Sequence, residues 1–161
     1  MTPFFRMFLA ACVLCAIAFL MSPYANAQEQ KGLSTIDVRA VGVHVASKHW
    51  PQAEWNNSNP GLYVMADVKG PAFLTGTYAA GTYFNSERKQ SVYVARVFNV
   101  VGPLDVAIGA ITGYKRASVM PLVAPSVKLP IAYGFAARVF VLPKVEPNGA
   151  WVAHLAVERS F

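Results

Sequence analysis

The final stretch of the chain, residues 151–161, alternates between two kinds of side chain. Every second residue is mainly apolar, with an aromatic at each end: Trp151, Ala153, Leu155, Val157, Arg159 and Phe161. The residues between them are small or polar: Val152, His154, Ala156, Glu158 and Ser160. A period of two indicates a β-strand, because successive side chains point to opposite faces. An apolar face opposite a polar one is typical of a membrane β-barrel, with lipid outside and a polar lumen inside.

The first 27 residues predict a secretory signal peptide. Arg6 supplies the positive charge, residues 8–21 form an apolar segment, and the small residues 25–27 (Ala-Asn-Ala) form a cleavage site. The alternative is a lipoprotein signal, in which Cys12 would become a lipidated N-terminus. Cleavage after residue 27 removes both cysteines of the chain, so the mature protein would contain no disulfide and no thiolate metal site.

Residues 28–161 correspond to about one domain. Arg6 is lost with the signal, so thirteen basic residues remain against eight acidic ones, a net charge of +5. The basic residues are scattered, which argues against nucleic acid; the acidic partner expected for an exported chain is the phosphate of lipopolysaccharide or of a phospholipid. No apolar run long enough for a second membrane helix follows residue 27. We expect a monomer without a cofactor in the outer membrane of a Gram-negative bacterium, exported through the periplasm.

Eight strand-like runs follow the signal, separated by connectors rich in Gly, Pro, Asn and Ser. They are 36–47, 62–68, 73–84, 91–101, 104–112, 119–129, 132–142 and 150–161. The connectors after the second, fourth and sixth runs are short and the others are longer, as expected when both termini lie in the periplasm. The sequence therefore predicts an all-β fold, an eight-stranded antiparallel up-and-down transmembrane β-barrel.

A soluble lipocalin-like barrel is the alternative, because it also has eight strands. Its apolar residues would line the lumen, whereas Asp105 and Arg138 lie opposite apolar faces and charges suit a lumen better than lipid. We expect Arg138 and Glu158 to pair in the lumen. The aromatic residues are expected in belts at the two membrane interfaces. They are Tyr63, Tyr78, Tyr83, Phe84, Tyr93, Tyr114, Tyr133, Trp50, Trp55 and Trp151.

His44 and Ser86 are the candidates for chemistry. His44 lies opposite the valines of the first run, so it should point into the lumen near the outer end. Ser86 follows the third run, which ends at the same rim. A serine and a histidine within hydrogen-bond reach are the minimum for nucleophilic or general-base chemistry. The structural alternative is a lumen histidine and a turn serine beside Asn85. The three histidines have no spacing that suits zinc.

Several features of residues 36–161 resemble the outer-membrane lipid A palmitoyltransferases, small eight-stranded barrels that move an acyl chain from phospholipid to lipid A. They are His44 followed by 55–63 (WNNSNPGLY), the Asn85-Ser86 pair, the proline-rich 120–125 leading to 132–135, and the closing Asn148-Gly149 with Phe161. By that resemblance His44 and Ser86 fall on the catalytic histidine and serine of the family. Asn85 stands where the family has an acid, and an amide can orient an imidazole but cannot stabilise an imidazolium by charge. The periplasmic amphipathic helix of the family has no counterpart in residues 28–35.

Prolines 121, 125 and 130 are expected to interrupt strand pairing, because proline has no N–H to donate. In the resembling family such interruptions act as lateral doors for lipid chains; the alternative is that these prolines only shape the barrel end. The residues expected to bind substrate are Trp55, Tyr83, Arg88, Pro121 and Pro125. Two functions stay open. One is a lipid A acyltransferase-like enzyme, either a transferase or an acyl hydrolase, and the other is a non-catalytic platform that binds through the loops 48–61 and 113–118.

Overall fold

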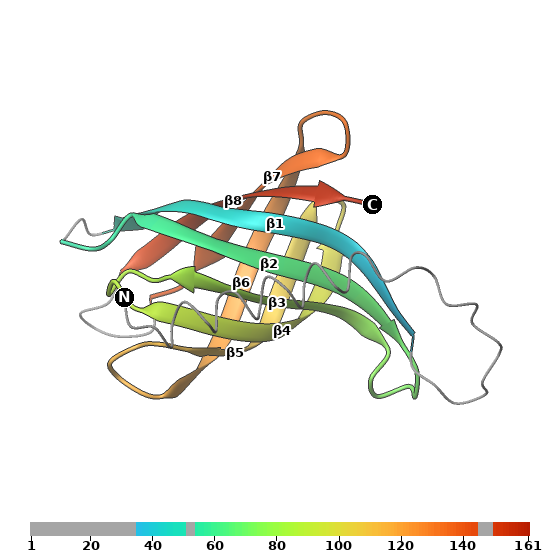
Figure 1. Ribbon diagram of the computed structural model, residues 1–161, viewed down its shortest axis with the longest axis horizontal. Helices are drawn as coiled ribbons and strands as arrows, with labels where there is room; N and C mark the ends of the chain where they lie inside the picture. The colour runs from blue at the N-terminus through green and yellow to red at the C-terminus, as the bar shows by residue number, and fades with distance from the viewer. Residues whose placement is uncertain (1–34, 51–53, 145–149) are drawn as a thin grey trace, which may run out of the picture. The chain divides into compact units, whose positions relative to one another are not determined.

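The computed structural model describes residues 35–50, 54–144 and 150–161. The expected signal peptide, the alternative at Cys12 and the Asn148-Gly149 hairpin lie outside these residues. The described chain forms eight strands: β1 (Thr35–Trp50), β2 (Ser58–Lys69), β3 (Gly76–Phe84), β4 (Gln90–Val101), β5 (Leu104–Thr112), β6 (Val119–Pro130), β7 (Phe135–Leu142) and β8 (Trp151–Ser160). Each strand pairs antiparallel with the next, and β8 pairs with β1, which closes the barrel (Figure 1). The predicted fold is confirmed.

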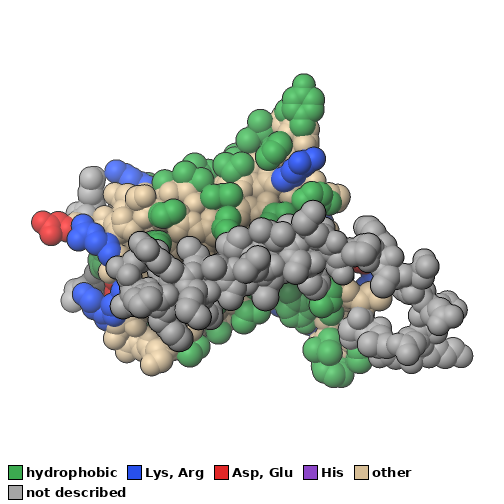
Figure 2. Space-filling model, in the orientation of Figure 1, with side chains coloured by type: hydrophobic (Ala, Val, Ile, Leu, Met, Phe, Trp, Pro, Cys, Tyr) green, Lys and Arg blue, Asp and Glu red, His purple; other side chains and the backbone are tan. Residues whose placement is uncertain are grey.

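The strands turn their apolar residues outward and their polar residues inward. In β8 the side chains of His154, Ala156 and Glu158 are buried, whereas their neighbours Leu155 and Val157 are exposed. The exposed large hydrophobic residues are distributed over all eight strands, and Figure 2 shows hydrophobic side chains along the upper and lower parts of the visible surface. A lumen that holds charges inside an apolar outer wall is the arrangement of a transmembrane barrel. Within the described ranges, no helix has the length and apolar character needed to cross a bilayer.

Four boundaries differ from those expected by three residues or more, and one of them is the start of β2, which begins at Ser58 and not at residue 62. Residues 73–75 belong to a turn, in which Pro71 O accepts hydrogen bonds from the N–H groups of Leu74 and Thr75. The 70–75 connector is therefore not short, and the predicted contrast in connector length is weaker. Residues 132–134 also form a turn, with Tyr133 and Gly134 at positive φ. β1 continues to Trp50, beyond its predicted end.

Both ends of the described chain meet at one end of the barrel, where Phe161 N–H donates to Arg39 O. We call this the terminal end. The outer end carries the connectors that follow β1, β3, β5 and β7.

An ionic cluster fills the lumen toward the terminal end. Arg138 donates to both Glu158 oxygens, at 2.7 and 3.1 Å, and to Asp105 Oδ2 at 2.6 Å. Tyr63 Oη donates to Glu158 Oε2 at 2.6 Å, and Lys128 Nζ lies 3.3 Å from Glu158 Oε1. The predicted pairing of Arg138 with Glu158 is confirmed. The charged groups of this buried cluster all have hydrogen-bond or ion-pair partners, so the cluster forms a plug in the lumen.

The expectation of aromatic belts holds for only part of the set. Trp50 and Trp151 face outward as a cross-strand pair at the outer end, each about half exposed. Tyr63, Tyr83 and Tyr93 point instead into the lumen, where their hydroxyl groups find hydrogen-bond partners. A tyrosine can fill a narrow lumen as well as it anchors an interface, and the sequence pattern does not separate the two roles.

Candidate functional site

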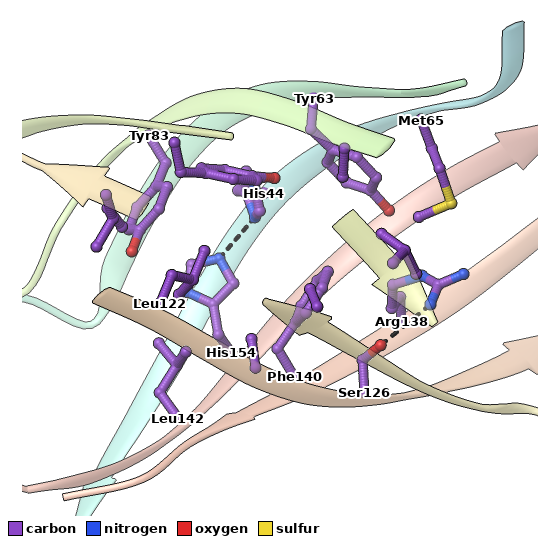
Figure 3. A pocket seen from close by; sticks show the side chains of 16 residues that line it. His44, Tyr63, Met65, Tyr83, Leu122, Ser126, Arg138, Phe140, Leu142 and His154 are labelled. Atoms are coloured by element: carbon purple, nitrogen blue, oxygen red, sulfur yellow. Dashed lines mark hydrogen bonds between the residues drawn. The ribbon is translucent and has the colours of Figure 1, made fainter. Parts of the chain in front are cut away.

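His44 lies in the middle of the lumen. Its Nε2 is 3.0 Å from Tyr93 Oη, and its Nδ1 is 2.8 Å from His154 Nε2. The rings of Tyr63 and Tyr83 pack against it, with centroids 5.1 and 5.0 Å away. Figure 3 shows the hydrogen bond that joins His44 to His154. Both side chains line a cavity of about 40 Å³. Both ring nitrogens of His44 are occupied, so it forms part of an aromatic layer that narrows the lumen.

Asn85 uses its side-chain amide to hold two turns together. It is fully buried in the turn between β3 and β4. Its Oδ1 accepts hydrogen bonds from the N–H groups of Glu87 and Lys89, and its Nδ2 donates to Ser91 Oγ and to Gly113 O. The amide therefore joins the β3–β4 turn to the connector after β5. With all of its hydrogen bonds used in this way, Asn85 has none left to orient an imidazole.

Ser86 does not meet His44. It lies in the turn after β3 and lines a cavity at the outer end, whereas His44 lines the mid-lumen cavity. The predicted pairing of the two is wrong for this reason. β1 is longer than the sequence indicated, so His44 lies deeper in the barrel than the rim on which Ser86 sits.

His49 is the histidine that shares a cavity with Ser86. The register of β1 shifts between His44 and Ala46, both against β2 and against β8, which marks a β-bulge at Val45. A bulge inserts one residue and therefore reverses which positions face inward beyond it. His44 points inward before the bulge and His49 after it, although they are five residues apart in the chain. Sequence alternation alone places His49 on the lipid face.

The imidazole of His49 is oriented and has one nitrogen free. Its Nδ1 is 2.8 Å from Asn57 Oδ1, and its ring stacks on Trp55 at a centroid distance of 5.8 Å. An amide oxygen only accepts hydrogen bonds, so Nδ1 is the donor in this pair, and the lone pair of the neutral imidazole is then on Nε2. His49 is 3% exposed, and Nε2 has no hydrogen-bond partner among the described residues. A buried basic nitrogen without a hydrogen-bond partner is unusual, and a donor that reached it could give it a proton.

The outer cavity has a volume of about 280 Å³. Ser86, His49 and Trp55 line it at the rim, and its deeper wall includes Ile111 and Leu122. Apolar side chains dominate the deeper wall.

Tyr114 and Tyr83 also line this cavity, and their hydroxyl oxygens are 3.3 Å apart. Burial raises the pKa of the Tyr114 phenol above its ordinary value, so this hydroxyl stays protonated at neutral pH.

The wall of the barrel is incomplete between β6 and β7. β6 pairs with β5 from Val119 to Val127 without a register shift, but its ladder with β7 begins only at Ser126. Pro121 and Pro125 are four residues apart, so both lack their N–H on the same side of the strand. Because the ladder with β5 passes through both prolines, that side is the one facing β7. The predicted interruption is therefore present at these two prolines, and it affects one neighbour only.

The interruption expected at Pro130 is not found. Pro130 lies opposite Ala136 in the β6–β7 ladder and is the last residue of β6. Its missing N–H therefore falls at the end of the strand, where the turn to β7 begins.

The outer cavity reaches the gap between β6 and β7. Its lining includes Pro121 and Val123, which face outward from β6, together with Leu142 and Val152 across the gap. The outer cavity is therefore bounded both by lumen residues and by outward-facing residues of β6 beside the gap.

Some of the residues expected to bind substrate line the outer cavity, and the others lie on the surface. Trp55, Tyr83 and Pro121 line the outer cavity. Pro125 lies on the outer wall at the gap and does not line this cavity. Arg88 is exposed in the β3–β4 turn at a φ of 60°. No group of three or more His, Cys, Asp or Glu residues suited to a metal ion is found in the described part of the chain.

No family model matches the chain, and no curated protein matches it. Among solved structures the chain is similar to a designed protein from "De novo design of transmembrane beta-barrels", with 12% sequence identity and a TM-score of 0.46. The match covers 83% of this chain and 100% of the designed one.

Proposed function

We propose that this protein is an outer-membrane barrel that takes an acyl chain of a membrane lipid into its outer cavity through the gap between β6 and β7. The observation that carries the proposal is the cavity itself, which joins an apolar lumen to the lipid-facing wall beside Pro121 and Val123. Its volume of about 280 Å³ is at the lower end of ligand pockets and suits part of a single chain. The Arg138–Glu158 plug closes the lumen below the cavity, which argues against a pore.

Binding is tested by filling the cavity. Ile111 is 5% exposed and lines the cavity, whereas Ile108 of the same strand is 50% exposed on the outer wall. Ile111→Trp should remove co-purified phospholipid or lipid A detected by native mass spectrometry, and Ile108→Trp should retain it. Both variants should keep the heat-modifiable gel mobility of a folded barrel. Equal lipid retention by wild type and Ile111→Trp would overturn the proposal.

A second candidate function is acyl transfer or acyl hydrolysis, which the resemblance to lipid A palmitoyltransferases implies. The unpaired Nε2 of His49, in the same cavity as Ser86, favours it. In this scheme Ser86 Oγ attacks the ester carbonyl of a phospholipid while His49 Nε2 accepts the hydroxyl proton. His49 then returns the proton to the departing alcohol, and the acyl group passes to a lipid A hydroxyl or to water. Asn57 holds the imidazole in the required tautomer.

Mass spectrometry of lipid A and phospholipids from cells with and without the protein tests this chemistry. Ser86→Ala and His49→Ala should each abolish the modification, and together they should be scarcely worse than either alone, because the two act as a unit. Ser118→Ala, at an exposed serine of the connector after β5, is the matched control and should be silent. If wild-type protein changes no lipid, the candidate function of acyl transfer or hydrolysis is overturned.

A further inference from the structure

The charged residues of the barrel are distributed unevenly between its two ends. At the terminal end the acidic residues have cationic partners: Asp37 with Lys69 at 3.2 Å, Asp67 with Arg39 at 3.7 Å, Asp105 with Arg138 at 2.6 Å, and Glu158 with Arg138 and Lys128 at 2.7 and 3.3 Å. Arg96 and Arg159 also lie toward this end, so six basic residues stand against four acidic ones among the described residues there.

At the outer end, cations predominate. Six exposed basic residues lie on the described parts of the outer end, against the acidic residues Glu54 and Glu87. They are Lys48, Arg88, Lys89, Lys115, Arg116 and Lys144. In Figure 2 most of the visible Lys and Arg side chains lie at the left of the view, beside an acidic group, and one basic group lies at the upper right; β1 finishes at the left in Figure 1. Among the described residues, the excess of basic over acidic residues is therefore four at this end and two at the terminal end.

Four of these cations lie on two turns that are fastened together. Arg88 and Lys89 belong to the β3–β4 turn, and Lys115 and Arg116 to the connector after β5. The buried side chain of Asn85 bonds the first turn internally and donates to Gly113 O of the second. Glu87 Oε2 accepts the N–H of Lys115 at 2.9 Å, a further link between the turns. We call this four-cation surface the basic platform.

The basic platform stands at the mouth of the outer cavity. Arg116 and Glu87 line the cavity together with Ser86. A lipid whose acyl chain lay in the cavity would bring its headgroup within reach of the platform. Guanidinium and ammonium groups bind phosphate oxygens by charge-assisted hydrogen bonds, and turns held by a buried amide lose little entropy when they bind.

We propose that the basic platform binds the phosphate groups of an anionic lipid headgroup and thereby selects which lipids occupy the cavity. This inference rests on the proposed function and names the lipid class that it serves. Asn85 is then the positioning residue of the platform, which explains why a fully buried amide ties two exposed turns together.

The test is isothermal titration calorimetry of the whole protein in zwitterionic detergent. The probes are dihexanoyl phosphatidylglycerol and dihexanoyl phosphatidylcholine, which have the same chains and differ in headgroup charge. Wild type should bind the anionic lipid about tenfold more tightly at low salt, and the preference should shrink in about 0.5 M salt because exposed charges are screened. The triple variant Arg88→Asn, Lys89→Gln, Lys115→Gln should reduce the preference to less than about twofold, because most of the platform charge is gone. Lys69→Gln, at the terminal end, should leave it unchanged.

The two proposals fail in different ways. An unchanged preference in the triple variant overturns the platform while leaving chain binding intact. Ile111→Trp tests the cavity. It should keep the acyl chain out of the cavity and therefore lower the affinity for both lipids by a similar factor. If Ile111→Trp lowers the affinity for neither lipid, the cavity proposal is overturned. Inorganic phosphate alone serves as the last probe. If its binding matches that of the anionic lipid, the headgroup model fails, because the acyl chain then adds nothing.

Discussion

The ionic plug allows the sharpest test of the structure. Glu158 is 1% exposed, and its carboxylate accepts two hydrogen bonds from Arg138 and one from Tyr63. Lys128 Nζ lies 3.3 Å from the same carboxylate. Glu158→Gln keeps the shape of the side chain but removes its negative charge. It also places an amide NH₂ group, which is a donor, next to the donor groups of Arg138 and Tyr63. Removing one partner of a buried pair costs about 3–5 kcal/mol. We expect a loss near the lower of these values, because Asp105 still holds Arg138 at 2.6 Å.

Asp105→Asn is the matched control. It removes one charge from the same guanidinium, but the Asp105 side chain is 15% exposed and Arg138 keeps both bonds to Glu158. A hydrogen bond to a charged group is worth about 1.5–3 kcal/mol, and partial exposure places this one near the lower value. Urea unfolding in phospholipid vesicles, followed by tryptophan fluorescence, measures both variants. If Glu158→Gln costs no more than Asp105→Asn, the plug is not organised around Glu158 and the reasoning fails.

Three further substitutions test local features. Gly42→Ala would place a Cβ on the ring of Tyr63 and should destabilise the barrel by about 1–3 kcal/mol in the same urea assay. Asn85→Asp, although it restores the acid of the resembling family, should also cost about 1–3 kcal/mol and speed proteolysis of the outer turns, because a carboxylate cannot donate to Gly113 O. An Asp variant as stable as wild type would contradict that role. Pro125→Ala adds a donor at the end of the β6–β7 ladder and should slow hydrogen exchange there; unchanged exchange would show that proline does not limit the ladder.

The barrel was predictable from the sequence because its strands obey one simple rule. A side-chain period of two, a polar face opposite an apolar face and turn residues between the runs indicate strands that separate lipid from lumen. The alternation of 151–161 reproduces the burial pattern of β8. The inward positions of His44, Asp105 and Arg138 followed from the same rule, because each lies opposite residues that suit lipid.

The candidate site was not predictable, because it depends on where that rule is broken. A bulge at Val45 reverses the alternation of β1 and brings His49 into the lumen, and nothing in the local sequence marks the extra residue. The length of β1 places His44 below the rim, so it meets Tyr93 and His154, two partners distant in sequence. The prolines indicated a break in pairing, but only the register showed which side of β6 it opens. The period of the sequence predicts which face of a strand carries a side chain. Strand pairing decides how deep in the barrel that side chain lies and which side chains it meets across the lumen. The pairing joins residues that are far apart in the sequence, so the sequence pattern does not reveal it.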